Sequence, residues 1–315
     1  SFNTYNDIFH FLGEPTYGNI EGEQGDWEFV ITKLTEDSIF VKGKKWENEM
    51  VFTRMADGVD WTSYLDSIAD VQKRLGVNYS VGNSSDASKM VEINSATRRI
   101  LSRTADGQMV EQPFYVTPTG IHAVNEPVAL GEDKAQDFLV SKAGVMTAKD
   151  NEDLTLNSYA PGIDTWVGEW TLSAMQGSCD MTISKVEDQE NMLKGTFTAG
   201  GYTYNIGLSF NPETGALNLP SQLIEDPSGR YPALWLMNAD LNQGTLLGQG
   251  GMNVVWHGVS QEGDFEDDGT LASEGYASDS FVALPCTADG EIIKENNQFV
   301  FVVEWYFLSN LTPNK

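Results

Sequence analysis

The sequence has few of the residues from which common catalytic and metal sites are built. The 315 residues contain only two cysteines, Cys179 and Cys286, and three histidines, His10, His122 and His257. The histidines lie in separate segments, too scattered for a zinc site with supporting residues around it. The motifs HExxH, GxSxG, GxxxxGK[ST] and GxGxxG after a strand are missing. We therefore predict no catalytic residues, no metal and no cofactor, and a protein that is not an enzyme.

Basic side chains and long apolar runs are also scarce. Lys and Arg number 19 against 46 Asp and Glu, which gives a formal charge of −27 at pH 7. Such a charge repels a nucleic-acid backbone and an anionic membrane surface, so we expect neither as a partner. No stretch approaches the roughly 20 apolar residues that a membrane helix requires. The acidity chiefly favours solubility, and the partners compatible with it are cations or neutral ligands such as glycans.

What the sequence does contain is alternation of apolar and polar residues, which is typical of strands. Segments 27–34, 38–43 and 49–55 alternate in this way between short polar turns, which predicts an antiparallel meander. Further strands are expected at 98–104 and 109–116. A hairpin is expected near 136–150.

One segment, 60–75, has the apolar spacing of a helix. Asp60 is a suitable N-cap, and Gly76 is a suitable residue to end the helix. The apolar face predicted for this helix consists of Trp61, Tyr64, Leu65, Ile68, Ala69 and Leu75.

The second half of the chain is predicted to hold about nine strands and no helix. A charged run followed by Pro161 and Gly162 marks a domain boundary in 150–165, which gives domains 1–158 and 159–315. Strands so closely spaced suggest a closed barrel or a sandwich. The last strand, 298–308, is apolar on both faces and is expected in mid-sheet or closing a barrel. The fold class is therefore mostly β, with two antiparallel domains and one helix.

The cysteines and His257 lie in strand patterns, which favours buried structural roles over catalysis. Cys179 lies near the start of the second domain and Cys286 near its end. If the sheet closes on itself, the two residues would be neighbours, and either a disulfide or two free thiols would fit.

Candidate ligand-binding positions are few. Asp264, Glu266 and Asp268, followed by Gly269, imitate the start of a calcium loop, but the acid expected at its twelfth position is replaced by Gly275. A solvated acidic loop is the alternative interpretation of that segment. Trp46 and Tyr231 lie in polar turns and could stack on a sugar, although single surface aromatics are common. The remaining strand tryptophans are expected in the core: Trp27, Trp170, Trp235, Trp256 and Trp305.

The N-terminal residues resemble an uncharacterised Bacteroidetes lipoprotein family, domain of unknown function 4302. Its pattern is a TYNxIFH run, a GDxEF strand, an IxLKGKKTGN hairpin and a DWTxYL helix. The matching residues are Thr4, Tyr5, Asn6, Ile8, Phe9 and His10; Gly25, Asp26, Glu28 and Phe29; Lys42, Gly43, Lys44, Lys45 and Asn48; Asp60, Trp61, Thr62, Tyr64 and Leu65. Trp46 and Glu47 depart from the family's Thr-Gly. The match is dense over residues 1–75 and weak beyond.

The resemblance implies an extracytoplasmic, surface-exposed outer-membrane lipoprotein whose lipid anchor, signal and first strands precede Ser1. It implies neighbouring transporter components as possible partners, and it carries over no catalytic residues. We expect a non-enzymatic binding or accessory module for glycan or peptide capture. The alternatives are a secreted, glycosidase-like hydrolase with an acid pair, and a structural envelope component. Two carboxylates about 5 to 9 Å apart in a cleft would favour the hydrolase, whereas an exposed aromatic row would favour binding.

Overall fold

The computed structural model describes residues 28–124 and 126–314. Strands make up 51% of the residues and helices 8%, which confirms the predicted mostly-β fold with a single α-helix. The described residues form two compact units, which divide between residues 64 and 65 and are described separately below. The expectations for Trp27 and His10 lie outside the described residues.

The first unit holds the predicted meander, a sheet in the order β1 (Phe29–Leu34), β2 (Ser38–Gly43) and β3 (Glu49–Thr53). The helix α2 (Trp61–Arg74) begins at its end. Asp60 caps this helix as predicted, because its carboxylate accepts the Thr62 N–H at 3.1 Å and the Ser63 hydroxyl at 2.6 Å. These bonds, that of the Ser63 side chain foremost, lower the pKa of Asp60.

The apolar face predicted for α2 is only partly buried. Ile68 and Leu75 pack against a barrel core, and Val71 is fully buried there. Trp61 and Leu65 of the same face, by contrast, are 65% and 52% exposed. The difference arises because the barrel contacts the C-terminal part of the helix.

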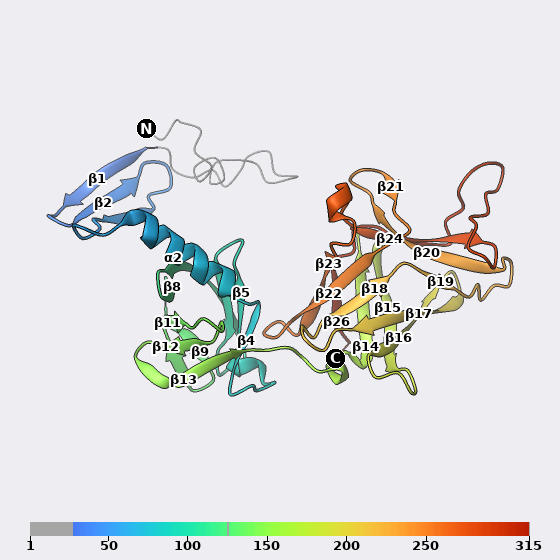
Figure 1. The fold of residues 1–315 in the computed structure, drawn as a ribbon, viewed down its shortest axis with the longest axis horizontal. Helices are drawn as coiled ribbons and strands as arrows, with labels where there is room; N and C mark the ends of the chain where they lie inside the picture. The colour runs from blue at the N-terminus through green and yellow to red at the C-terminus, as the bar shows by residue number, and fades with distance from the viewer. Residues whose placement is uncertain (1–27, 125, 315) are drawn as a thin grey trace. The chain divides into compact units, whose positions relative to one another are not determined.

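The second unit contains two closed antiparallel barrels (Figure 1). In the first barrel each strand pairs with the next along the chain, and the last strand returns to pair with the first. Its strands are β4 (Asn78–Val81), β5 (Met90–Asn94), β6 (Arg99–Arg103), β7 (Met109–Thr117), β8 (Gly120–Ala123), β11 (Asp137–Val140), β12 (Met146–Ala148) and β13 (Asn151–Ser158). A 3₁₀ turn η1 (Ala87–Lys89) and a separate pair, β9 (Val128–Leu130) with β10 (Asp133–Ala135), lie within these connections.

Strand β13 occupies the first part of the segment 150–165, and sequence analysis did not predict it. Its charged residues hide an alternation in which Leu154 and Leu156 point into the core. The strand pairs with β4 and so closes the first barrel. The predicted domain boundary, between residues 158 and 159, falls in the connection between the two barrels. This boundary stays a prediction, because the division into compact units lies between residues 64 and 65 and does not test it.

The second barrel follows after a 3₁₀ turn, η2 (Ile163–Trp166). Its strands are, in order around the barrel, β14 (Gly168–Ala174), β15 (Gly177–Lys185), β16 (Met192–Ala199), β17 (Tyr202–Phe210), β18 (Leu217–Pro220), β22 (Gly251–His257), β23 (Glu262–Asp267) and β26 (Asn310–Pro313). A further sheet comprises β19 (Gln222–Ile224), β20 (Ala233–Asp240), β24 (Ser280–Cys286) and β25 (Val303–Trp305), with β21 (Thr245–Leu246) against β20 and the 3₁₀ turn η3 (Ala272–Glu274) nearby in sequence.

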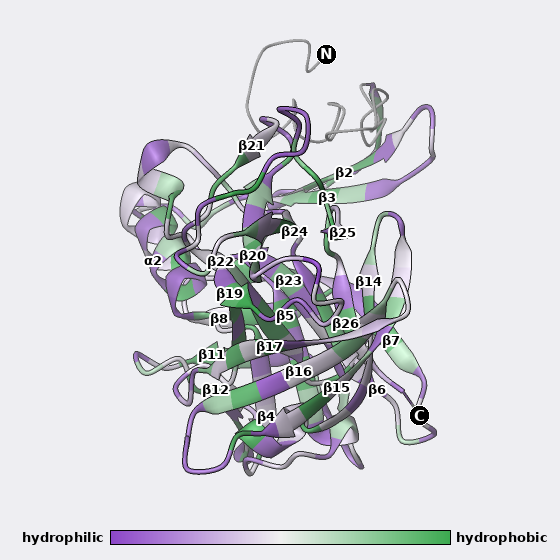
Figure 2. Cartoon of the chain, turned by 90° about the vertical axis from the view of Figure 1, so that its right-hand side faces the viewer, coloured by the Kyte–Doolittle hydropathy of each residue, from purple (hydrophilic) through white to green (hydrophobic). Residues whose placement is uncertain are grey.

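The second barrel has a tryptophan-rich core. Trp166, Trp170 and Trp256 are at most 5% exposed, and their ring centroids lie 5.4 to 6.2 Å apart. The Trp166 ring N–H donates to the Gly215 carbonyl and that of Trp170 to the Trp166 carbonyl, so these buried donors are satisfied. Figure 2 shows the underlying alternation of polar and apolar residues along strands such as β16.

The long final strand predicted at 298–308 is wrong. Only β25 is a strand there, and it lies at the edge of the further sheet, where it pairs with β24. Phe299 and Phe301 are 45% and 41% exposed. The barrel is closed instead by β26, which pairs with β14 and β23. The apolar composition of the segment did not reveal that the chain leaves the barrel after β23 and returns only at Asn310.

The expectation that barrel closure brings the two cysteines together also fails, because the chain leaves the barrel after β23. Cys179 lies on β15 of the barrel, but Cys286 ends β24, outside it, so barrel closure does not make them neighbours. Both thiols are free. Burial raises the pKa of both thiols, which keeps them in the less reactive protonated form.

Candidate functional site

The most elaborate polar arrangement lies at the β22–β23 hairpin of the second barrel. Along β22, Met252, Val254 and Trp256 point into the core. The alternate residues, Asn253, Val255 and His257, therefore face outward. Opposite them on β23 lie Glu266, Asp264 and Glu262, respectively. One outer face of a single hairpin thus carries most of the polar groups of the site.

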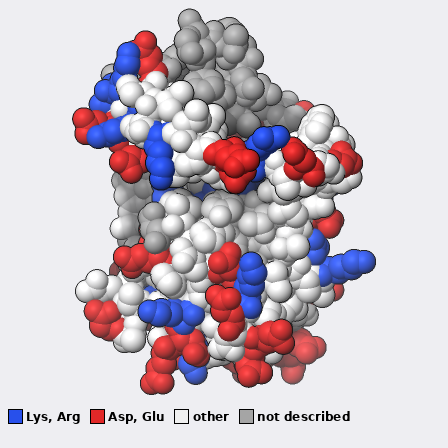
Figure 3. All heavy atoms as spheres, turned by 90° about the vertical axis from the view of Figure 1, so that its left-hand side faces the viewer, with Lys and Arg blue, Asp and Glu red and all other residues white. Residues whose placement is uncertain are grey.

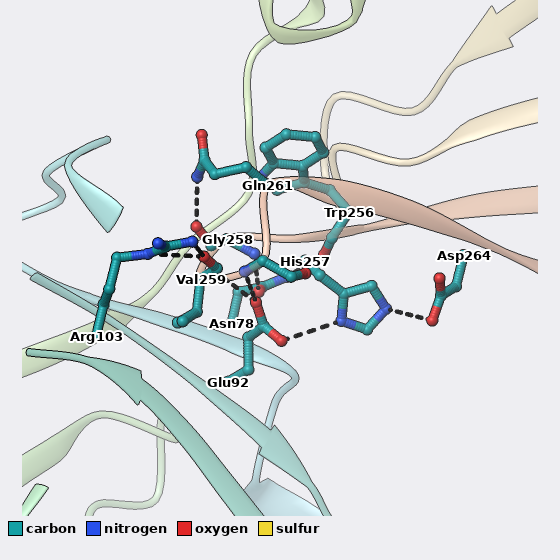
Figure 4. Close-up of polar contacts among 10 residues, drawn as sticks. Asn78, Glu92, Arg103, Trp256, His257, Gly258, Val259, Gln261 and Asp264 are labelled. Atoms are coloured by element: carbon teal, nitrogen blue, oxygen red, sulfur yellow. Dashed lines mark hydrogen bonds and ion pairs between the residues drawn. The ribbon is translucent and has the colours of Figure 1, made fainter. Parts of the chain in front are cut away.

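The tip of this hairpin binds to the first barrel through backbone groups (Figure 4). The Asn78 amide donates to the Trp256 carbonyl at 2.5 Å and accepts the Gly258 N–H at 2.9 Å. Arg103 donates two N–H groups to the Val259 carbonyl, at 2.6 and 3.2 Å. Because one side chain from β4 and one from β6 bind successive peptide groups of the tip, the hairpin is fixed in position.

Glu92 on β5 is the third residue of the first barrel that binds the tip. Its Oε1 accepts the N–H groups of Val259 and Ser260 at 2.5 and 2.9 Å. The Glu92 residue is only 7% exposed and Val259 is fully buried. A buried carboxylate needs such charge-assisted bonds to offset its lost hydration.

Gly258 is sterically required in this contact. A Cβ added there would lie 2.5 Å from the Met90 sulfur and 3.4 Å from the Asn78 side-chain oxygen. Any other residue would push Met90 out of its place. The sequence Trp-His-Gly therefore encodes the close approach of the tip to the first barrel.

His257 lies between two carboxylates, one from each barrel. Its Nδ1 is 3.4 Å from Glu92 Oε2, and its Nε2 is 3.3 Å from Asp264 Oδ2. Contact with Asp264, followed by contact with Glu92, raises the pKa of His257 to about 10, although burial opposes the shift. The ring is therefore a cation at neutral pH with a carboxylate at each nitrogen. Neither nitrogen is placed to act as a base or to bind a metal.

Two cavities lie along the hairpin. The first, called here the acidic cavity, has a volume of about 630 Å³. Its ionisable lining residues are Glu92, Arg99, Glu111, His257, Glu262, Asp264 and Glu266. Because the His257 ring fills the space between Glu92 and Asp264, those two carboxylates cannot hold a sugar and a water between them. This arrangement differs from the open acid pair that glycoside hydrolysis requires.

The second cavity, called here the amide cavity, has a volume of about 590 Å³. Its lining includes Tyr159, Phe210, Asn211, Asn218 and Asn253, together with several hydroxyl groups, and none of the lining residues is Lys, Arg or His. The two cavities share Val77, Val255 and Glu266, so they adjoin one another.

A polar row crosses four neighbouring strands at the amide cavity. Ser209 on β17 lies opposite Asn218 on β18, Asn218 opposite Asn253 on β22, and Asn253 opposite Glu266 on β23. All four residues line the cavity. Strands are about 4.8 Å apart, so the row extends over about 14 Å.

The proposed calcium loop is not a loop. Asp264 and Glu266 lie within strand β23, and Asp268 follows it. Alternate residues of a strand are about 7 Å apart, too far for all three to reach one ion at about 2.4 Å. Within the described part of the chain, no group of three or more His, Cys, Asp or Glu side chains is placed to hold a metal ion.

The two aromatics considered for stacking lie elsewhere. Trp46 is 53% exposed, and the Lys45 ammonium lies 4.7 Å from the centroid of its ring. Tyr231 is partly buried and donates its hydroxyl to Glu295 at 2.5 Å. His122 pairs with Asp137 at 2.9 Å on the first barrel. None of these residues lines either cavity.

Sequence reasoning missed the residues that make the site: Asn78, Glu92, Arg103, Tyr159, Asn211, Asn218 and Asn253. A signal was present in Met252–His257, where alternation places Asn253 on the same face as His257. The partners from the first barrel carried no such signal, because they lie more than 150 positions away.

One face of the described residues shows no feature typical of binding to an anionic polymer (Figure 3). On the face drawn in Figure 3, Lys and Arg are scattered among Asp and Glu and form no continuous basic area among the residues shown in colour. In the portion of the chain that the structure describes, no helix is both long and apolar enough to cross a membrane.

A family model matches the first part of the chain. The family model named Domain of unknown function (DUF4302) matches residues 1–142, which confirms the resemblance found in the sequence. The matched range contains Asn78, Glu92 and Arg103 but neither the β22–β23 hairpin nor the second barrel. No curated protein and no solved structure matches the chain.

Proposed function

We propose that this protein is a non-enzymatic binding module that captures a glycan or a peptide at the junction of its two barrels. The observation that carries the proposal is the amide cavity, a polar hollow of about 590 Å³ beside a fixed hairpin. This size lies within the range of small-molecule sites, about 300 to 1,000 Å³. Asn78, Glu92 and Arg103 hold the hairpin by its backbone, so the cavity is formed before the ligand arrives.

The acidic cavity supports binding over hydrolysis. A glycosidase-like mechanism requires two carboxylates with a sugar or water between them. Here the imidazolium of His257 occupies that space between Glu92 and Asp264. Asp264 and Glu266 also line this cavity about 7 Å apart along β23, and analysis of the recovered ligands for cleavage tests this second pair.

The cellular setting forms part of the same proposal. We propose an extracytoplasmic, surface-exposed outer-membrane lipoprotein that works beside transporter components. Its support is the family match over residues 1–142. Membrane fractionation of the producing cell, followed by protease treatment of intact cells, tests the location. Recovery of the protein in the cytosol would contradict it.

The binding experiment uses the whole chain immobilised against panels of oligosaccharides and of peptides, followed by analysis of the recovered ligands. We expect retention of at least one ligand class and recovery of that ligand intact. New reducing ends or new peptide termini would replace the proposal by a hydrolase. Failure to retain any member of either panel would contradict a capture function.

A further inference from the structure

We infer that the ligand of the amide cavity is an uncharged oligosaccharide lying along the polar row of Ser209, Asn218, Asn253 and Glu266. This inference rests on the proposed binding function and names its ligand class. It follows from how the hydrogen-bonding groups of the cavity are oriented, from the charges that its lining lacks, and from the closure of the barrels around it.

The orientation of Asn253 is fixed by a chain of hydrogen bonds. A carboxylate at Asp268 can only accept, so the Asn218 side-chain NH₂ must face it, at 3.4 Å. The same NH₂ donates to Asn253 Oδ1 at 3.2 Å. The Asn253 NH₂ must therefore point away from Asn218. It has no hydrogen-bond partner among the described residues, and Asn253 lines the cavity.

Asn211 presents a second free donor by the same reasoning. Its Oδ1 accepts the backbone N–H groups of Glu213 and Thr214, at 2.9 and 3.4 Å. Its NH₂ is thereby turned outward and has no partner in the described chain. Two amide donors are thus fixed at the edge of one cavity.

Acceptors and a ring complete the lining. The carboxylates of Glu213 and Glu266 make no ion pair or hydrogen bond with any described side chain, and both line the cavity. Tyr159 lies there partly buried, and burial raises the pKa of its hydroxyl, which stays a neutral donor and acceptor. A sugar hydroxyl both donates and accepts, so it satisfies an amide NH₂ and a carboxylate placed side by side. The partly buried Tyr159 also brings an apolar ring to the lining.

The lining argues against other ligand classes. With no Lys, Arg or His among the lining residues, phosphates and carboxylates have no counter-charge. One recurring way to capture an extended peptide is to add it as a strand to a free sheet edge. Both barrels beside the cavity are closed, so the strands that line it offer no such edge. A neutral chain of hydroxyl groups fits the row of about 14 Å.

The inference is tested by calorimetric titration of the whole chain. The ligands are neutral glucose-, xylose- and mannose-based oligosaccharides of two to six units, a uronic-acid oligosaccharide of matched length, and a peptide pool. The variants are N253A, N211A and Y159A, with N205A as control. Asn205 is an exposed asparagine on β17 that lines neither cavity.

We expect a neutral oligosaccharide to bind and the uronic acid to bind at least tenfold more weakly. N253A should weaken binding about tenfold, and N211A and Y159A severalfold, while N205A should leave it unchanged. Melting temperatures identify any variant that fails to fold. If N253A fails to fold, the test relies on N211A instead, because Asn211 is exposed. Binding of peptides only, equal binding of the uronic acid, or sugar binding insensitive to all three variants would overturn this inference and leave the capture function standing. No binding by any ligand would overturn both.

Discussion

The cationic state of His257 gives the sharpest physical prediction. The folded protein raises the pKa of His257 from 6.5 to about 10. A pKa raised by folding stabilises the protein fully below pH 6.5, and this stabilisation is lost as pH rises through 10. The interval between 6.5 and about 10, at about 1.4 kcal/mol per pH unit, sets an upper bound of about 5 kcal/mol.

The expected loss is smaller than this bound. The His257 side chain is 22% exposed and that of Asp264 is 48% exposed, so solvent screens the second contact. We expect the free energy of unfolding to fall by about 2 to 3 kcal/mol between pH 6.5 and 10 because of this residue. In H257Q that component should vanish, so its pH profile should be flatter than that of the native chain over this interval.

Glu92 provides the matched perturbation. E92Q keeps the shape of the side chain and an oxygen for the Val259 and Ser260 N–H groups, but removes the charge beside His257. We expect the pKa of His257 to fall toward its ordinary value, and the variant to be about 2 kcal/mol less stable at pH 7. E111Q is the control, because Glu111 lines the same acidic cavity and its side chain makes no hydrogen bond or ion pair with any described residue.

Ring-proton NMR from pH 5 to 11 measures the titration directly, and the resonance of His257 is identified by its loss in H257Q. Urea unfolding at the same pH values measures stability. A native pKa near 6.5, or equal pH profiles for the native chain and H257Q, would refute the reasoning. A drop in the pKa of His257 in E111Q as large as that in E92Q would also count against the assignment of Glu92.

Three further predictions concern other positions. G258A should be destabilised by about 1 to 3 kcal/mol, because its Cβ would lie 2.5 Å from the Met90 sulfur, while G162A, with nothing within 4 Å of the added Cβ, should be close to neutral by urea unfolding. Thiol titration under denaturing, non-reducing conditions should find two free thiols per chain, and a count of zero would disprove the free state of both cysteines. In the folded protein, the buried Cys286 should react more slowly than Cys179. Melting curves in calcium and in chelator should coincide, since Asp264, Glu266 and Asp268 lie along an extended segment; a calcium-dependent rise in melting temperature would contradict this.

The fold was predictable wherever local alternation determined the structure. The meander, α2 and most strands of the second barrel follow from patterns within about ten residues. Segment 298–308 failed because apolar composition does not specify a pairing partner, and pairing of β26 with β14 spans about 140 positions. Strand β13 was not predicted, because the charged Glu152 and Asp153 obscured the alternation that buries Leu154 and Leu156.

The site was much less predictable than the fold. The interpretation of His257 as a structural residue agrees with its two carboxylate contacts, but nothing near it in sequence points to Glu92. Asn218 and Asn253 become neighbours only through strand pairing across 35 positions. Sites assembled from paired strands depend on register, and single-sequence patterns do not contain register.

The contact between Glu92 and the hairpin tip also has a kinetic consequence, because it joins residues 167 positions apart. All strands of the first barrel lie within residues 78–158, so this barrel can close while the hairpin is still unsynthesised. About 100 residues separate the end of this barrel from residue 259, so at about 5 to 20 residues per second the hairpin tip emerges about 5 to 20 s later. We expect the hairpin to dock late, after the rate-limiting step of folding. Loss of the Glu92 charge should then accelerate unfolding while leaving the folding rate nearly unchanged.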